Sequence, residues 1–217
     1  MKSVLISISP KWCVFIASGE KTIEVRKTKL KIETPFKCYI YCTGVKSMNL
    51  RDYVVAHQAT GGAVDDWSGK VIGEFVCDNV FLLRPYTYDG GSADLEQRKL
   101  IQTFEGSSKD NEILSATCLS QDEIFDYIGV GNYGYGWHIS DLKIYDKLKE
   151  LSEFTAADKK AIRQCKTREQ SYYAFTDTGY IKNGFYCREK DDWCFGGCKR
   201  KALTRPPQSW CYVEELP

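Results

Sequence analysis

The residues best suited to chemistry lie close together near the N-terminus. The segment from Ser18 to Lys27 reads SGEKTIEVRK and brings together a lysine, a glutamate and an arginine, at Lys21, Glu24 and Arg26. A lysine beside a carboxylate can keep its charge and hold an anion, or lose its proton on burial and act as a base. The segment therefore predicts a site for anion binding or for proton transfer.

An alternating strand would position these side chains. Residues 22–26 place isoleucine and valine on one face and Thr22, Glu24 and Arg26 on the other. The apolar face would pack inward, so the other face would present three polar side chains in a row. Alternating charges along a strand also occur on faces that only meet solvent, and this interpretation stays open at this point.

A second carboxylate, Glu74, lies within the apolar strand expected over residues 70–80. A carboxylate among apolar neighbours is costly unless it is paired or close to water. A pairing with Lys21 or Arg26 would offset that cost. We therefore expect Lys21, Glu24, Arg26 and Glu74 to converge on one water-filled hollow.

Short strands and few helices are predicted around this segment. Ser9 and Pro10 are typical of a helix start, and Gly19 of its end. The sequence Ser120 to Glu123 is a capping box that opens another helix. Strands are expected over residues 4–8, 22–26, 36–43, 70–80, 137–145 and 209–215, further helices over 49–60 and from Thr155 to Cys165, and a long excursion over 85–118.

Bulk properties exclude several classes of protein. The 217 residues carry a net charge of +1, so no global basic field holds long nucleic acid, and any such contact needs a local patch. No segment approaches the roughly 20 apolar residues that span a bilayer, and residues 1–10 lack the cleavage site of a signal peptide. We expect a cytoplasmic protein without a membrane partner. Neither a phosphate-binding glycine loop nor a dinucleotide fingerprint occurs, so no organic cofactor is expected.

Ten cysteines in a cytoplasmic chain need an explanation other than disulfides. Four of them fall in the polar stretch 152–202, at Cys165, Cys187, Cys194 and Cys198. Four thiolates on a loop-rich segment suit a tetrahedral structural zinc ion that substitutes for a missing core. Free thiols in a disordered loop are the alternative. The six other cysteines lie in apolar segments and are expected to fill the core.

Four segments resemble ASCH domains, which belong to the PUA-like superfamily. They are Ser18 to Arg26, Gly69 to Phe75 (GKVIGEF), Tyr135 to Ile139 (YGWHI) and Arg205 to Val213 (RPPQSWCYV), the last two resembling longer members from phages and gut bacteria. The resemblance covers roughly residues 1–149 and 203–217. It implies an α+β fold, a PUA-like mixed β-barrel with flanking helices. The domains expected are the barrel over 1–151, a cysteine-containing insertion over 152–202, and a final strand in 203–217 that completes the barrel.

The resemblance also implies binding of RNA or of a nucleotide- or nucleoside-sized ligand. In that hypothesis Lys21 and Arg26 meet phosphate or carbonyl oxygens, and Glu24 and Glu74 accept from base or sugar donors. Thr22 adds a hydroxyl beside them. Tyr41, Tyr135 and Trp137 would form a stacking wall.

A hydrolase is the main alternative. One similar family member removes the acyl group of acetylcytidine with a lysine, a threonine and a glutamate. The lysine matches Lys21 and the glutamate matches Glu74, but the threonine falls at Glu24. A carboxylate cannot replace a hydroxyl nucleophile in the same scheme. Glu24 or Glu74 could still activate water, with Lys21 or Arg26 stabilising an oxyanion. A third hypothesis is a phage-encoded protein that binds a host factor of unknown identity.

Overall fold

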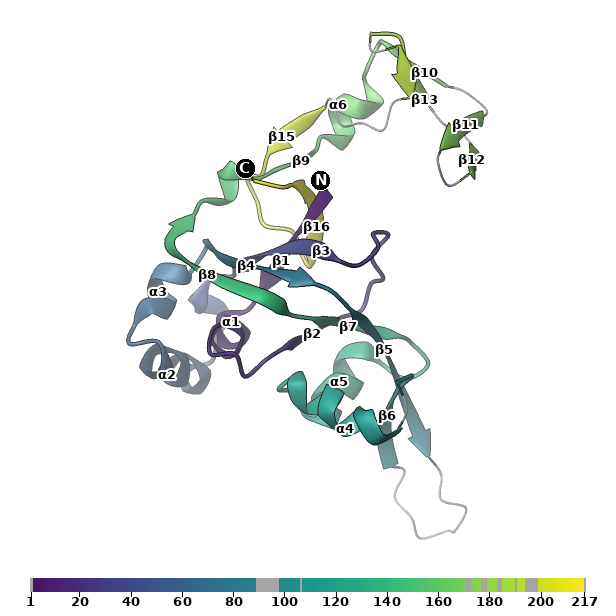
Figure 1. Ribbon diagram of the computed structural model, residues 1–217. Coiled ribbons are helices and arrows are strands. Elements are labelled where there is room, and N and C mark those ends of the chain that lie inside the picture. The colour runs from purple at the N-terminus through teal and green to yellow at the C-terminus, as the bar shows by residue number, and fades with distance from the viewer. Residues whose placement is uncertain are drawn as a thin grey trace.

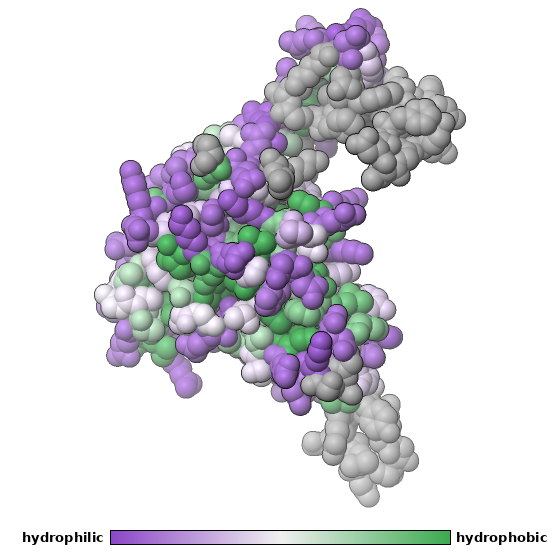
Figure 2. All heavy atoms as spheres, in the orientation of Figure 1, coloured by the Kyte–Doolittle hydropathy of each residue, from purple (hydrophilic) through white to green (hydrophobic). Residues whose placement is uncertain are grey.

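The computed structural model describes residues 2–88, 98–105, 107–170, 173–176, 179–182, 185–189, 191–193 and 199–216. A mixed sheet and an antiparallel sheet, with helices packed around them, make up its main body, and a smaller arm of short elements projects from one end (Figure 1). The face shown in Figure 2 is mostly hydrophilic, with hydrophobic side chains gathered across its middle.

The first sheet has five strands in the order β16-β1-β3-β4-β8. β1 lies second in this order, parallel to β3 and antiparallel to β16, so the two ends of the chain meet in one sheet. The first and last of the predicted strands therefore both form, and they pair with each other. The strands are β1 (Lys2–Ile8), β3 (Phe36–Cys42), β4 (Val71–Cys77), β8 (Ser140–Lys149) and β16 (Trp210–Glu214).

The second sheet has four strands in the order β2-β7-β5-β6. The strand expected over residues 137–145 is divided between the two sheets, because the chain leaves the second sheet after His138 and joins the first at Ser140. The strands are β2 (Ile23–Arg26), β5 (Val80–Tyr88), β6 (Arg98–Thr103) and β7 (Gly134–His138).

Five helices and a 3-10 turn surround these sheets. Pro10 opens the first helix after Ser9, and Gly19, with φ of 80°, follows its end, as predicted. Ser120 and Glu123 form the predicted capping box. The elements are α1 (Pro10–Ala17), η1 (Val45–Ser47), α2 (Leu50–Ala59), α3 (Ala63–Trp67), α4 (Ser107–Ala116) and α5 (Gln121–Ile128).

The expectation that residues 85–118 form a long excursion without regular elements is wrong. It contains the end of β5, all of β6 and all of α4. Ile101 of β6 and Ile113 of α4 pack in one cluster with Ile23 of β2. Tertiary packing of a few apolar side chains thus overrides a local composition rich in glycine, serine and charge.

The polar stretch after β8 forms the arm. It begins and ends with a pair of antiparallel strands, β9 and β15, and Phe154 just before it is fully buried against Tyr39. The helix predicted from Thr155 starts later, because Thr155 lies in β9 and Asp158 caps the helix instead. The described elements are η2 (Leu151–Glu153), β9 (Thr155–Ala157), α6 (Lys159–Arg163), β10 (Arg168–Gln170), β11 (Tyr173–Thr176), β12 (Gly179–Lys182), β13 (Phe185–Cys187), β14 (Asp192–Trp193) and β15 (Arg200–Ala202).

The fold is α+β with flanking helices, as predicted, and one of its two main sheets is mixed. Among the described strands, the backbone pairing gives two separate main sheets and does not close a single barrel. A shared apolar core joins them: it holds Val4 and Ile6 of β1, Phe75 of β4 and Trp137 of β7. No helix in the described part of the chain is long and apolar enough to span a membrane.

Candidate functional site

Three charged side chains of the predicted segment are buried together. Lys21 is 2% exposed, Glu24 6% and Arg26 7%. The alternative interpretation, in which the charged face of this strand only meets solvent, is therefore wrong. Both faces are covered, because Ile23 and Val25 pack against α4 and α5 while Glu24 and Arg26 face the core between the two sheets.

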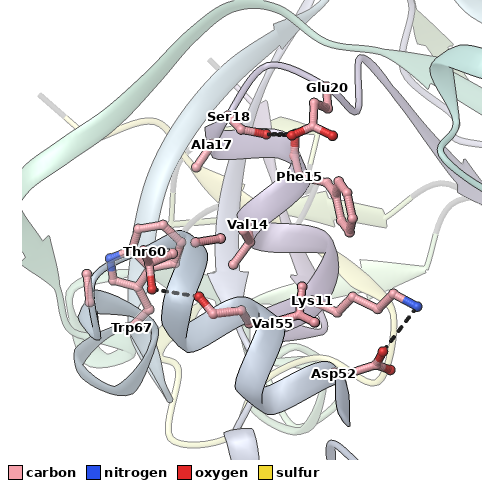
Figure 3. A pocket seen from close by; sticks show the side chains of 13 residues that line it. Lys11, Val14, Phe15, Ala17, Ser18, Glu20, Asp52, Val55, Thr60 and Trp67 are labelled. Atoms are coloured by element: carbon pink, nitrogen blue, oxygen red, sulfur yellow. Dashed lines mark hydrogen bonds and ion pairs between the residues drawn. The ribbon is translucent and has the colours of Figure 1, made fainter.

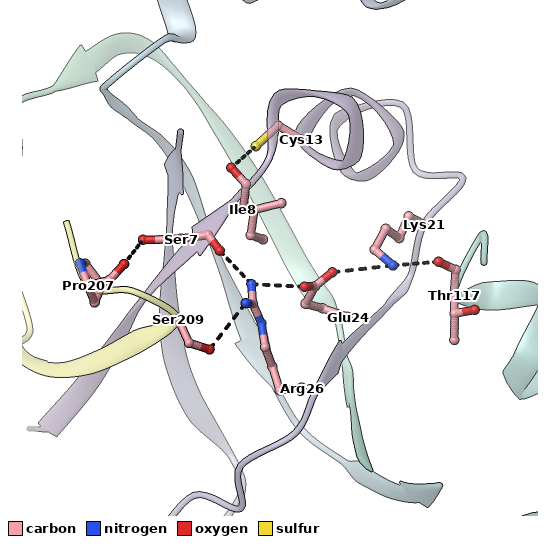
Figure 4. A network of polar contacts seen from close by, with 9 residues as sticks. All are labelled: Ser7, Ile8, Cys13, Lys21, Glu24, Arg26, Thr117, Pro207 and Ser209. Atoms are coloured by element: carbon pink, nitrogen blue, oxygen red, sulfur yellow. Dashed lines mark hydrogen bonds and ion pairs between the residues drawn. The ribbon is translucent and has the colours of Figure 1, made fainter. Parts of the chain in front are cut away.

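Glu24 bridges the two cations. Its carboxylate lies 3.4 Å from Lys21 Nζ and 3.0 Å from Arg26 Nη2 (Figure 4). The three side chains therefore carry a net charge of +1 in a region removed from water. Burial raises the pKa of the neighbouring Cys13 and Cys38 thiols, which stay protonated and add no charge.

Backbone carbonyls from distant segments hold the two cations. Lys21 Nζ donates to the carbonyl of Thr117, between α4 and α5, at 2.5 Å. Arg26 Nη2 donates to the carbonyl of Ser7 in β1 at 2.7 Å, and Arg26 Nη1 reaches Ser209 Oγ, just before β16, at 3.4 Å. The cluster is thus anchored to both sheets and to the loop between two helices.

One donor of the cluster has no partner. Arg26 Nε is buried and makes no hydrogen bond within the described residues. A buried donor without a partner costs about 1–3 kcal/mol. An acceptor atom of a bound molecule would remove that cost.

The cluster opens into a hollow of about 370 Å³. Two aromatic side chains belong to its lining, Trp12 from α1 and Tyr127 from α5, and Lys21 Nζ lies 5.1 Å from the centre of the Trp12 ring. Ser7 and Ser9 add hydroxyl groups. The full lining is Ser7, Ile8, Ser9, Trp12, Lys21, Glu24, Val25, Arg26, Leu119, Glu123 and Tyr127.

Among solved structures, this chain is similar to ASCH from Zymomonas mobilis, at 13% identity and a TM-score of 0.48, over 98% of this chain and 88% of that one. A serine-to-alanine mutant of that protein matches at 13% identity and a TM-score of 0.47, over 98% of this chain and 89% of that one. A tyrosine-to-phenylalanine mutant matches at 15% identity and a TM-score of 0.42, over 70% of this chain and 77% of that one. No protein-family model matches the sequence, and no curated protein matches it.

Glu74 does not join the cluster, so its predicted pairing with Lys21 or Arg26 is wrong. Its carboxylate accepts from the Tyr145 hydroxyl at 2.6 Å and lies 3.5 Å from Lys37 Nζ. On β4, Phe75 and Cys77 face the core between the sheets, and Glu74 points to the opposite face because side chains alternate. Lys37 and Tyr145 thus satisfy the carboxylate on the far side of the first sheet.

The predicted stacking wall does not form either. Tyr41 packs with Val71 and Phe154 on that same far face, where burial raises the pKa of its hydroxyl. Trp137 is fully buried, edge-on to Phe36 at 5.7 Å, and Tyr135 packs against the same core. Thr22 is held through its backbone and is absent from the hollow's lining.

Trp12 and Tyr127 line the hollow instead, and the sequence analysis named neither. Trp12 lies in the first turn of α1 and is only partly buried. Tyr127 is 38% exposed, in the last turn of α5. Tyr127 lies far from Arg26 in the chain, so no local spacing connects it with the charged strand.

A second hollow of about 520 Å³ lies on the other side of α1, between α1, α2 and α3 (Figure 3). Val14, Phe15, Val55 and Trp67 make most of its wall apolar. Its charged groups sit at the edge, where Lys11 Nζ lies 3.5 Å from Asp52. It contains no buried charge, so the chemistry predicted from the sequence belongs to the smaller hollow.

Two of the four predicted zinc ligands lie together in the arm. The sulfur of Cys165 is 3.3 Å from the Thr167 hydroxyl, and that of Cys187 is 3.9 Å from the same atom. Cys194 and Cys198 lie outside the described residues. The described part of the chain holds no group of three metal-ligating side chains, and zinc binding stays a prediction.

Proposed function

We propose that the hollow binds a base-bearing ligand of nucleotide size, as a free nucleotide or nucleoside or as one nucleotide of an RNA strand. The observation that carries this proposal is the buried cluster of Lys21, Glu24 and Arg26 opening between the rings of Trp12 and Tyr127. Aromatic rings and fixed cations are the two features that recognise a base and its phosphate or carbonyl oxygens.

The charges suit an anionic or carbonyl-rich ligand. Two cations face one carboxylate, and the N–H group of Arg26 Nε has no hydrogen-bond partner among the described residues. Because the cations are held by backbone carbonyls, they are already oriented before a ligand arrives. Such preorganisation lowers the ordering cost of binding.

Binding is favoured over hydrolysis by where the carboxylates lie. The glutamate expected as a catalytic partner, Glu74, is engaged by Tyr145 and Lys37 on the far face. The Ser7 hydroxyl already donates to the Pro207 carbonyl at 2.7 Å. Lys21 Nζ already donates to a carbonyl and faces a carboxylate, so it is engaged by two acceptors rather than held free as a base.

We also propose a cytoplasmic location. The eight described cysteines are all free, four of them buried in the core between the sheets. Reduced thiols in such number suit a reducing compartment.

Isothermal titration with nucleosides, mononucleotides and short single-stranded RNAs tests the function. Trp12→Ala should weaken binding about tenfold, since stacking on an aromatic ring contributes about 1–3 kcal/mol per base. Phe15→Ala is the matched control, because Phe15 lies on the same helix but lines the other hollow. Folded protein that binds none of these ligands, or equal losses in the two variants, would overturn the proposal.

A modified nucleoside, acetylcytidine, separates binding from turnover. Chromatography of acetylcytidine after incubation should show no product. Deacetylation by the wild-type protein, lost in Lys21→Ala, would select the hydrolase instead.

A further inference from the structure

Three exposed lysines follow the cluster directly in the chain. Lys27, Lys29 and Lys31 lie in the connection between β2 and β3, all are exposed, and none forms an ion pair with any carboxylate in the described residues. We call this set the lysine ridge. Three unpaired cations in succession give a chain of net charge +1 a local positive field.

Several other lysines of the surface are paired. Lys37 pairs with Glu74 and Glu215, Lys70 with Glu150, and Lys201 with Asp158. Those charges are largely neutralised by their partners, whereas the ridge places three cations close together in the chain, directly after the buried cluster.

The backbone of the ridge is anchored. Leu30 is 8% exposed and belongs to the core between the sheets, and Ile32 packs against the same core. The backbone N–H of Lys31 donates to the Tyr212 hydroxyl of β16 at 2.8 Å. Because Leu30 points inward, its neighbours Lys29 and Lys31 project outward from a fixed base.

The ridge starts at the wall of the hollow. Lys27 follows Arg26 of the buried cluster, and its Nζ lies 4.7 Å from the centre of the Tyr127 ring. Tyr127 is one of the two aromatic side chains of the hollow. A base lying against Tyr127 would therefore place its own backbone beside Lys27.

We propose that the lysine ridge binds the phosphates of a single-stranded nucleic acid while one base of that strand occupies the hollow. This inference rests on the proposed function and extends it from a single nucleotide to a strand. Aromatic stacking together with a line of cations that follows the backbone is the way in which proteins hold single strands. Phosphate binding by lysine releases counterions, so the affinity depends steeply on salt.

The salt dependence of affinity for a labelled six-nucleotide strand tests the ridge. Each phosphate contact in a single strand contributes about −0.7 to the slope of log K against log salt concentration. Replacing Lys27, Lys29 and Lys31 together by alanine should make that slope shallower by about 2. Affinity for a nucleoside, which carries no phosphate, should change little, because none of the three lysines lines the hollow.

The matched control replaces Lys46, Lys143 and Lys147, three exposed lysines that likewise lack an ion-pair partner among the described residues and do not line the hollow. Its slope should equal that of the wild type. Equal slopes in the ridge variant and the wild type, with nucleoside binding retained, would overturn the ridge and leave the proposed function standing. A wild-type protein that binds neither nucleosides nor mononucleotides would remove both.

Parallel titrations with RNA and DNA strands of the same sequence identify the source of the phosphates. Equal slopes are expected, since both carry the same backbone charge. Tighter binding of RNA at all salt concentrations would add a 2′-hydroxyl contact in the hollow. Binding of duplex in preference to either single strand would contradict the inference.

Discussion

Glu24→Gln is the sharpest test of the buried cluster. Glutamine keeps the size of the side chain and removes the negative charge. The side chain of Glu24 is 9% exposed and lies between Lys21 and Arg26, whose side chains are 1% and 8% exposed. The variant leaves two buried cations facing an amide that can accept well from only one of them.

The expected loss of stability in Glu24→Gln follows from the burial of its two partners. Removing one partner of a buried ion pair costs about 3–5 kcal/mol, because the remaining charge is left uncompensated. In a chain of this size each kcal/mol lowers the melting temperature by about 2–4 °C. We therefore expect Glu24→Gln to melt about 10 °C below the wild type, by roughly the same amount at low and moderate salt, since buried charges are poorly screened.

Urea denaturation gives the free energies of unfolding of the wild type, of the single variants Lys21→Met and Glu24→Gln, and of the double variant Lys21→Met/Glu24→Gln. The double variant removes one of the two orphaned cations, so it should be more stable than Glu24→Gln alone. Phosphate should also stabilise Glu24→Gln more than the wild type, by supplying the missing negative charge. A Glu24→Gln variant within about 0.5 kcal/mol of the wild type, as at an ordinary surface site, would refute the reasoning.

Three further predictions concern residues outside the cluster. Glu74→Gln should leave ligand affinity within about twofold by titration and cost about 1–2 kcal/mol in urea, because it weakens the Tyr145 hydrogen bond; a tenfold loss of affinity would return Glu74 to the site. A hydrogen bond with Thr167 lowers the pKa of the Cys165 thiol, whereas burial raises those of Cys13 and Cys38, so iodoacetamide at neutral pH should label Cys165 first in the zinc-free protein by peptide mass spectrometry; earlier labelling of either core thiol would contradict the burial. Protein purified without added zinc should hold about one zinc per chain, lost in Cys187→Ser; zinc-free protein with reduced thiols would leave these cysteines as free thiols.

Local sequence signals predicted the elements that local chemistry controls. Pro10 and Gly19 bound α1, and Ser120 with Glu123 opens α5, because capping depends on a few neighbouring residues. Thr155 shows the limit of such signals. It is as good a cap as Asp158, but pairing with β15 makes it part of a strand, and the pairing partner lies 47 residues away at Ala202.

The positions of the site residues depended on contacts across the chain. Glu24 and Glu74 are alike in sequence terms, each a carboxylate in an alternating apolar strand. The register of β2 with β7 turns Glu24 toward the core between the sheets, and the pleat of β4 turns Glu74 away from it. A shift of one residue in either strand would exchange these outcomes, and sequence alone does not reveal the register.

The sequence by itself determined the chemistry available to this protein: a lysine, a glutamate and an arginine within a single short segment, and the likeness of that segment to ASCH domains. Tertiary structure decided what those groups contact. Ser7, Thr117 and Ser209 come from β1, from the loop before α5 and from the approach to β16, and the hollow exists only where these meet beside Trp12 and Tyr127. The physical reason is that hydrogen bonds and burial depend on proximity in space, whereas composition and spacing record proximity along the chain.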